Sequence, residues 1–146
     1  MDAQLLSRQS QRLLQLGVAL LLFTSFEGFA VQSFASSSLG RSVHTLSGFT
    51  AILLMTFGLL WTRLALGPPA ARVAFWFLIY SSLAIIVAFL MAAVWGAGNT
   101  VMPIAAGSAR GTAAQEMAIT VVAYSSAPPG IISFALVLWG LRVRES

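Results

Sequence analysis

Residues 73–95, VAFWFLIYSSLAIIVAFLMAAVW, run without one charged side chain. About 20 apolar residues are enough for a helix to cross the hydrocarbon core of a bilayer, so this stretch predicts a transmembrane helix. Three further apolar stretches of similar length surround it, at residues 13–34, 44–66 and 117–141. We therefore expect an all-α integral membrane protein, an antiparallel four-helix bundle that occupies residues 1–146 as a single domain.

The composition also favours a membrane protein. Hydrophobic residues make up 58% of the chain, charged residues make up 8%, and the mean hydropathy is +0.89. The first apolar stretch follows a polar segment, residues 2–15, and no small-residue cleavage site lies close behind a short apolar core. It is expected to be a retained helix and not a signal peptide. With no cysteine in the chain, a disulfide framework, an iron–sulfur cluster and a thiolate metal site are excluded.

The basic residues, all of them arginines, predict the orientation. The two termini and the 67–72 connection are flanked by Arg8, Arg12, Arg63, Arg72, Arg142 and Arg144, whereas the other connections hold only Arg41 and Arg110. By the positive-inside rule, both termini and the 67–72 connection face the cytoplasm. The isoelectric point near 11.2 does not indicate nucleic-acid binding, because these arginines lie at helix ends and form no basic stripe.

Two features of the apolar stretches predict local structure. Pro128 and Pro129 lie in the middle of the fourth stretch, so that helix is expected to kink or break and to leave carbonyls of the preceding turn unpaired. The tryptophans lie toward the ends of the stretches and predict an interfacial belt. They are Trp61, Trp76, Trp95 and Trp139.

Two glutamates lie in or beside the apolar stretches. Glu27 is well inside the first, where an unpaired carboxylate would cost several kcal/mol unless it took up a proton, so it must face the bundle interior. A functional Glu27 would be a general acid or base, or a hydrogen-bond partner of a polar ligand. A structural Glu27 would be a carboxyl bonded to a neighbouring helix. Glu116 has a simpler structural role, because an acidic residue in the first turn of a helix complements the helix dipole and Thr112 can cap that turn.

His44 is the only histidine in the chain and begins the second apolar stretch. A lone histidine usually bonds a backbone carbonyl, but it is also a potential metal ligand. Ser47 and Gly48 share its helical face, and the small glycine leaves room for a large flat ligand. A single histidine leaves haem iron five-coordinate with one face open, whereas zinc would need three protein ligands and only carboxylates remain to supply the others. Tyr80 and Tyr124 lie deeper in their apolar stretches than the tryptophans do, and either would line a cavity.

Residues 95–107, WGAGNTVMPIAAG, continued by Gly111-Thr112 and Gln115-Glu116, resemble the hydroxylaminobenzene mutases, which are small bacterial membrane enzymes. The similarity covers most of the chain and extends to the histidine-led second stretch and to residues 59–61 (LLW), 72–80 (RVAFWFLIY) and 136–142 (LVLWGLR). Those enzymes rearrange an aryl hydroxylamine to an aminophenol without net redox change. The chain is more distantly similar to styrene oxide isomerase, a trimeric four-helix membrane protein whose ferric haem b acts as a Lewis acid on an epoxide.

The resemblance implies that His44 is the axial ligand of haem b, beside Ser47 and Gly48, in a homotrimer of the bacterial inner membrane. It implies a redox-neutral rearrangement of a small aromatic substrate, in which ferric iron draws charge from the breaking bond. Glu27, Thr50 and Tyr80 are then the candidates to position the substrate or move a proton. The alternatives are an epoxide-to-carbonyl isomerase, a non-catalytic haem-binding or assembly subunit of a membrane complex, and a structural bundle without cofactor.

The chain also departs from these families at positions expected to face the substrate. Thr50 and Ala51 stand where both families place asparagine followed by glycine, and Leu83 and Ile85 stand where the mutases tend to have a second tyrosine and an asparagine. The loss of these polar groups implies a less polar substrate or a related subunit without activity. Glu27 is a candidate for the compensating polar group.

Overall fold

The computed structural model describes residues 2–142, which form helices joined by short connections. The long helices are α1 (Asp2–Ala30), α2 (Ser37–Leu60), α3 (Pro68–Trp95) and α5 (Ala113–Gly140); the short ones are η1 (Val31–Ser33), η2 (Trp61–Arg63) and α4 (Pro103–Ala106). Within the described residues, four helices are long and apolar enough to cross a bilayer, so the predicted all-α class and its four candidate spans are confirmed. The first helix is longer than predicted, because the polar segment before residue 13 is helical too.

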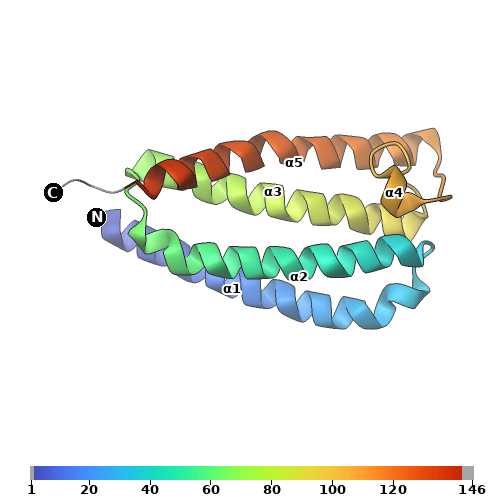
Figure 1. The fold of residues 1–146 in the computed structure, drawn as a ribbon, viewed down its shortest axis with the longest axis horizontal. Helices are drawn as coiled ribbons and strands as arrows, with labels where there is room; N and C mark the ends of the chain where they lie inside the picture. The colour runs from blue at the N-terminus through green and yellow to red at the C-terminus, as the bar shows by residue number, and fades with distance from the viewer. Residues whose placement is uncertain (1, 143–146) are drawn as a thin grey trace.

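The long helices form two antiparallel pairs, α1 with α2 and α3 with α5, and α2 joins the pairs by packing on α3 (Figure 1). The beginning of α1 and the end of α5 lie at one end of the bundle, and α4 lies at the other. A buried cluster at the α4 end packs Leu39 and Val43 of α2 against Ala106 of α4 and Ile119 of α5. The long connection between α3 and α5 therefore supports the segment of α2 that carries His44.

The helix ends follow from local sequence. The Ser36 hydroxyl accepts a hydrogen bond from the Leu39 amide and caps α2, and Gly96, at a φ of 62°, ends α3 in the left-handed region that favours glycine. Thr112 caps α5 as predicted, in a capping box with Gln115, since the Thr112 hydroxyl accepts from the Gln115 amide and the Gln115 side chain accepts from the Thr112 amide.

The sequence predicts that this helix kinks or breaks at Pro128 and Pro129. A break is wrong, because α5 continues as one helix through both prolines, whereas the kink stays a prediction. An internal proline costs about 3 kcal/mol through its lost hydrogen bond and its steric clash. Contacts with α3 just after the prolines offset this cost. The Ser133 hydroxyl donates to the Ala74 carbonyl at 2.8 Å, and Gly130 lies so close to Ser81 that a Cβ would come within 2.6 Å of the Ser81 Oγ.

Trp61 does not belong to an interfacial belt, and the prediction is wrong for this residue. Its side chain is completely buried, and its Nε1 donates to Gln9 Oε1 at 3.0 Å. Gln9 Nε2 in turn donates to the Ala71 carbonyl at 3.4 Å, so a buried polar link joins α1, η2 and α3. The other three tryptophans are exposed on the bundle surface, where the predicted belt requires them.

Candidate functional site

His44 lies near the start of α2, with its imidazole against α1 and its side chain 47% exposed. The ring fits there because residue 28 is a glycine. A Cβ at Gly28 would meet His44 Cε1 at 2.9 Å and Nδ1 at 3.1 Å. These distances are shorter than ordinary van der Waals contact, so a larger residue at position 28 would have to displace the imidazole.

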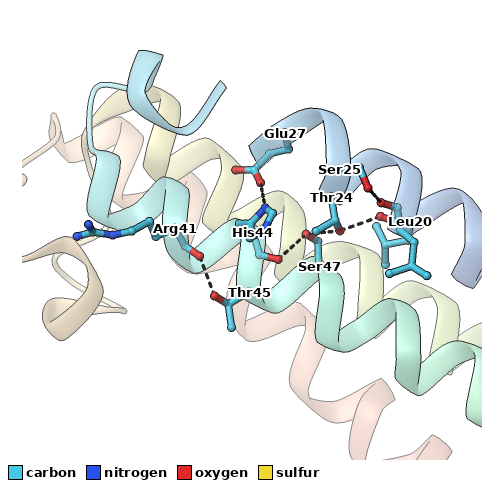
Figure 2. Close-up of polar contacts among 9 residues, drawn as sticks. Leu20, Thr24, Ser25, Glu27, Arg41, His44, Thr45 and Ser47 are labelled. Carbon is cyan, nitrogen blue, oxygen red and sulfur yellow. Dashed lines mark hydrogen bonds and ion pairs between the residues drawn. The ribbon is translucent and has the colours of Figure 1, made fainter. Parts of the chain in front are cut away.

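Glu27 of α1 points toward His44 of α2 (Figure 2). Its Oε2 lies 3.2 Å from His44 Nδ1, and the carboxyl side chain is only 3% exposed. The other carboxylate oxygen, Oε1, is buried and has no hydrogen-bond partner among residues 2–142. When Glu27 is ionised, Nδ1 donates to it, and Nε2 is left as the ring nitrogen able to bind a ligand.

Ser47 and Gly48 face α1. The fully buried Ser47 hydroxyl donates to the His44 carbonyl at 3.2 Å and lies 2.8 Å from Thr24 Oγ1, as Figure 2 shows. A Cβ at Gly48 would meet Thr24 Cγ2 at 3.5 Å. Both residues therefore support the α1–α2 contact behind His44, and their predicted contact with a cofactor gains no support from these positions.

A hollow of about 370 Å³ opens beside His44, lined by Gly28, Val31, Gln32, Arg41, His44 and Thr45. Arg41 and Thr45 also line a neighbouring hollow of about 570 Å³, which extends along α2 to Phe49 and to Phe89 of α3. A ligand larger than the first hollow can therefore spread along α2. Arg41 places a positive charge at the junction of the two.

The other predicted catalytic residues lie elsewhere in the single chain. Tyr80 of α3 lies on the opposite helix pair, where its hydroxyl is 2.8 Å from Ser125 Oγ of α5. Both residues line an apolar groove of about 580 Å³ to which Leu83 also contributes. Thr50 is buried within the bundle, and Tyr124 is exposed. The fold thus brings Glu27 to His44, but it does not bring Tyr80 to either of them within one chain.

Glu116 has a structural role, as predicted, but by an interaction that the sequence did not reveal. Its carboxylate accepts backbone hydrogen bonds from Gly98 at 2.8 Å, Thr100 at 3.1 Å and Gly111 at 3.1 Å. These amides lie at the two ends of the connection between α3 and α5. Glu116 therefore closes this connection into a compact loop. The clustered glycines, which allow its turns, were the only indication of this loop in the sequence.

Four helices that could span a membrane, and a half-exposed histidine beside a buried glutamate, define a small helical protein of the membrane type with one imidazole that is open to a ligand. The model of the styrene oxide isomerase family matches residues 9–142, and the chain belongs to this family. Hydroxylaminobenzene mutase HabB of Ectopseudomonas oleovorans is 42% identical over 91% of the chain and 81% of its own length. Hydroxylaminobenzene mutase HabA of the same organism is 32% identical over 86% of the chain and 93% of its own length.

No solved structure matches the chain. The comparisons confirm the resemblance seen in the sequence, to the mutases and to styrene oxide isomerase alike. Homology to the two mutases makes the chain an isomerase that rearranges its substrate intramolecularly.

Proposed function

We propose that the protein is a haem-dependent mutase that converts an aryl hydroxylamine to an aminophenol without net redox change. The observation that carries this proposal is the 42% identity to a hydroxylaminobenzene mutase along nearly the whole chain. A second candidate is the isomerisation of an aryl epoxide to a carbonyl compound. The apolar groove beside Tyr80 favours that less polar substrate, because Leu83 stands there where the mutases tend to have a polar residue.

The residues around His44 fit a haem. Nδ1 is engaged by Glu27, so Nε2 would be free to bind the iron, and Gly28 leaves space for the imidazole. Arg41, in the same hollow, can pair with a propionate of the macrocycle. When bound, a ferric haem would supply a Lewis acid that draws charge from the breaking bond.

The protein's own groups would orient the substrate and handle its proton. His44 would hold the haem iron, and the buried residues behind it would orient the imidazole. The Tyr80 hydroxyl can turn from Ser125 to donate to a polar atom of an aromatic substrate in the α3–α5 groove, whereas the Ser125 hydroxyl already donates to the Val122 carbonyl. Thr50 remains a proposed positioning group. We propose a homotrimer, in which the Tyr80 groove of one copy can face His44 of the next.

We also propose that the bundle lies in the bacterial inner membrane with both termini in the cytoplasm. At the end of the bundle where α1 begins, Arg8, Arg12 and Arg72 line one hollow of about 220 Å³. Gathered positive charge at this end supports a cytoplasmic location for it under the positive-inside rule.

Turnover without external electrons tests the proposed reaction. The detergent-purified protein is expected to show a Soret band and to convert hydroxylaminobenzene to an aminophenol under anaerobic conditions without NAD(P)H. Reduction to the ferrous state is expected to slow the reaction, because the lower charge withdraws less electron density. A strict requirement for a reductant would point to a redox enzyme, and absence of a Soret band would point to a bundle without haem.

Gly28→Ala tests the space beside His44. The added methyl group would meet the imidazole at 2.9 Å and push it away from Glu27. Overpacking of this kind costs about 1–3 kcal/mol, so we expect haem affinity to fall roughly tenfold in a titration of apoprotein with haem. Gly67→Ala is the control, since a Cβ there meets nothing closer than Pro69 at 3.9 Å. Equal affinities in both variants would show that Gly28 does not set the position of His44.

A further inference from the structure

We propose that Glu27 is a positioning residue that gives His44 anionic character and thereby holds the bound iron in the ferric state. The inference rests on the proposed haem ligation by His44 and adds a function for the buried carboxyl. It differs from the expectation that Glu27 exchanges a proton with the substrate.

The contacts of Glu27 lead to His44 and not to a ligand. The carboxyl lies 3.2 Å from Nδ1, on the side of the imidazole away from the ring nitrogen that would bind iron. Gly28 and His44 line the adjacent hollow, whereas Glu27 does not. With only 3% of its side chain exposed, Glu27 acts on anything in that hollow through the imidazole.

The charge on Glu27 is compensated incompletely by the protein. In the part of the chain that the structure describes, its one ion-pair partner is His44, and Oε1 receives no hydrogen bond. A buried carboxylate in this state favours a further positive charge nearby. Because Nδ1 donates to the carboxylate, that charge can be bound at Nε2, on the other side of the ring.

The oxidation state of a haem decides whether it supplies this charge. Ferric iron in a porphyrin carries a net positive charge, whereas ferrous iron in the same macrocycle is neutral. The carboxylate therefore stabilises the ferric form over the ferrous form, both by direct attraction and by making the imidazole a stronger donor. A Lewis-acid isomerase needs the ferric form. Glu27 would thus keep the haem in the ferric state that the reaction needs.

The test is the ferric-to-ferrous ratio of Glu27→Gln. Glutamine keeps the size of the side chain and an oxygen that accepts from Nδ1, but it carries no charge. In a spectroelectrochemical titration of the purified holoprotein, the ratio at a fixed potential is expected to fall about tenfold or more, which corresponds to a rise of roughly 59 mV in a one-electron potential. The iron–histidine stretching frequency of the ferrous protein is expected to fall as well, because the imidazole becomes a weaker donor.

Ser25→Ala is the matched control, because Ser25 lies on the same helix, is exposed, and donates only to the Leu21 carbonyl of its own helix. Its ferric-to-ferrous ratio is expected to equal that of the wild type. An unchanged ratio in haem-loaded Glu27→Gln would overturn the proposal, and a hundredfold rate loss at that unchanged ratio would show that Glu27 acts on the substrate directly.

Two further outcomes are separate from these. If Glu27→Gln does not retain haem, the iron–histidine stretching frequency of the ferrous wild-type protein tests the proposal instead. A frequency equal to that of a neutral imidazole complex would contradict it. Absence of haem from the wild type itself would instead refute the proposed function, so the two failures are distinguishable.

Discussion

His44→Ala is expected to abolish haem retention while the four helices still insert and fold. The chain has no second histidine and no cysteine, and ligation by a single methionine such as Met55, Met91 or Met102 would be weak. The fold should survive because His44 is half exposed and its imidazole makes one hydrogen bond, to Glu27. Leaving the buried carboxyl without this partner costs about 1–3 kcal/mol. The measurement is the ratio of Soret to protein absorbance after purification in detergent.

Added imidazole provides the complementary experiment. The space vacated in His44→Ala adjoins the open hollow, so free imidazole is expected to enter and to restore part of the haem absorbance. Thr45→Ala is the control, since Thr45 lines the same hollow and its hydroxyl only donates to the Arg41 carbonyl of its own helix. An unchanged Soret band in His44→Ala would show that another residue binds the haem.

Glu116→Ala is expected to loosen the connection between α3 and α5. Three backbone amides, those of Gly98, Thr100 and Gly111, would lose their shared acceptor. Hydrogen bonds to a charged group contribute about 1.5–3 kcal/mol each when protected, but the bond from Thr100 is exposed and those from Gly98 and Gly111 are only partly buried, so water can replace much of what is lost. We therefore expect a total loss of roughly 2 kcal/mol in the free energy of unfolding.

Thermal unfolding in detergent measures the stability of Glu116→Ala, and trypsin measures the opening of the loop, because Arg110 lies within it. Cleavage after Arg110 is expected to accelerate in the variant while the four long helices stay resistant. Met117→Ala is the control, since the neighbouring Met117 side chain is 64% exposed. Equal melting temperatures and cleavage rates in the two variants would mean that Glu116 does not hold the loop.

The loosened loop should also weaken the site. The connection packs through Ala106 against Leu39 and Val43, and Val43 precedes His44 in α2. Glu116 is thus linked to His44 by packing over a long sequence separation. The sequence indicated the capping position of Thr112 but did not indicate this link, because a carboxylate in a first helical turn has a sufficient local explanation in the helix dipole.

Local sequence determined the elements of this protein. In a bilayer, a long apolar segment must satisfy its backbone hydrogen bonds within itself. Residues 73–95 and the three other apolar stretches therefore form helices whatever their packing partners. The cost of burying charge also singled out Glu27, and the rarity of histidine singled out His44. Both inferences needed only the residue types in the sequence and not the positions of neighbouring helices.

Only the tertiary structure decided which of these residues meet. Glu27 reaches His44 because a turn folds α2 back along α1, and Trp61 leaves the expected belt because Gln9 offers a buried acceptor for its N–H. The fold likewise keeps α5 continuous through two prolines and places Tyr80 on the helix pair opposite His44. Apolar length and periodicity are properties of one segment, whereas the partner of a polar group depends on the rotation and register of two packed helices, which neither segment encodes alone.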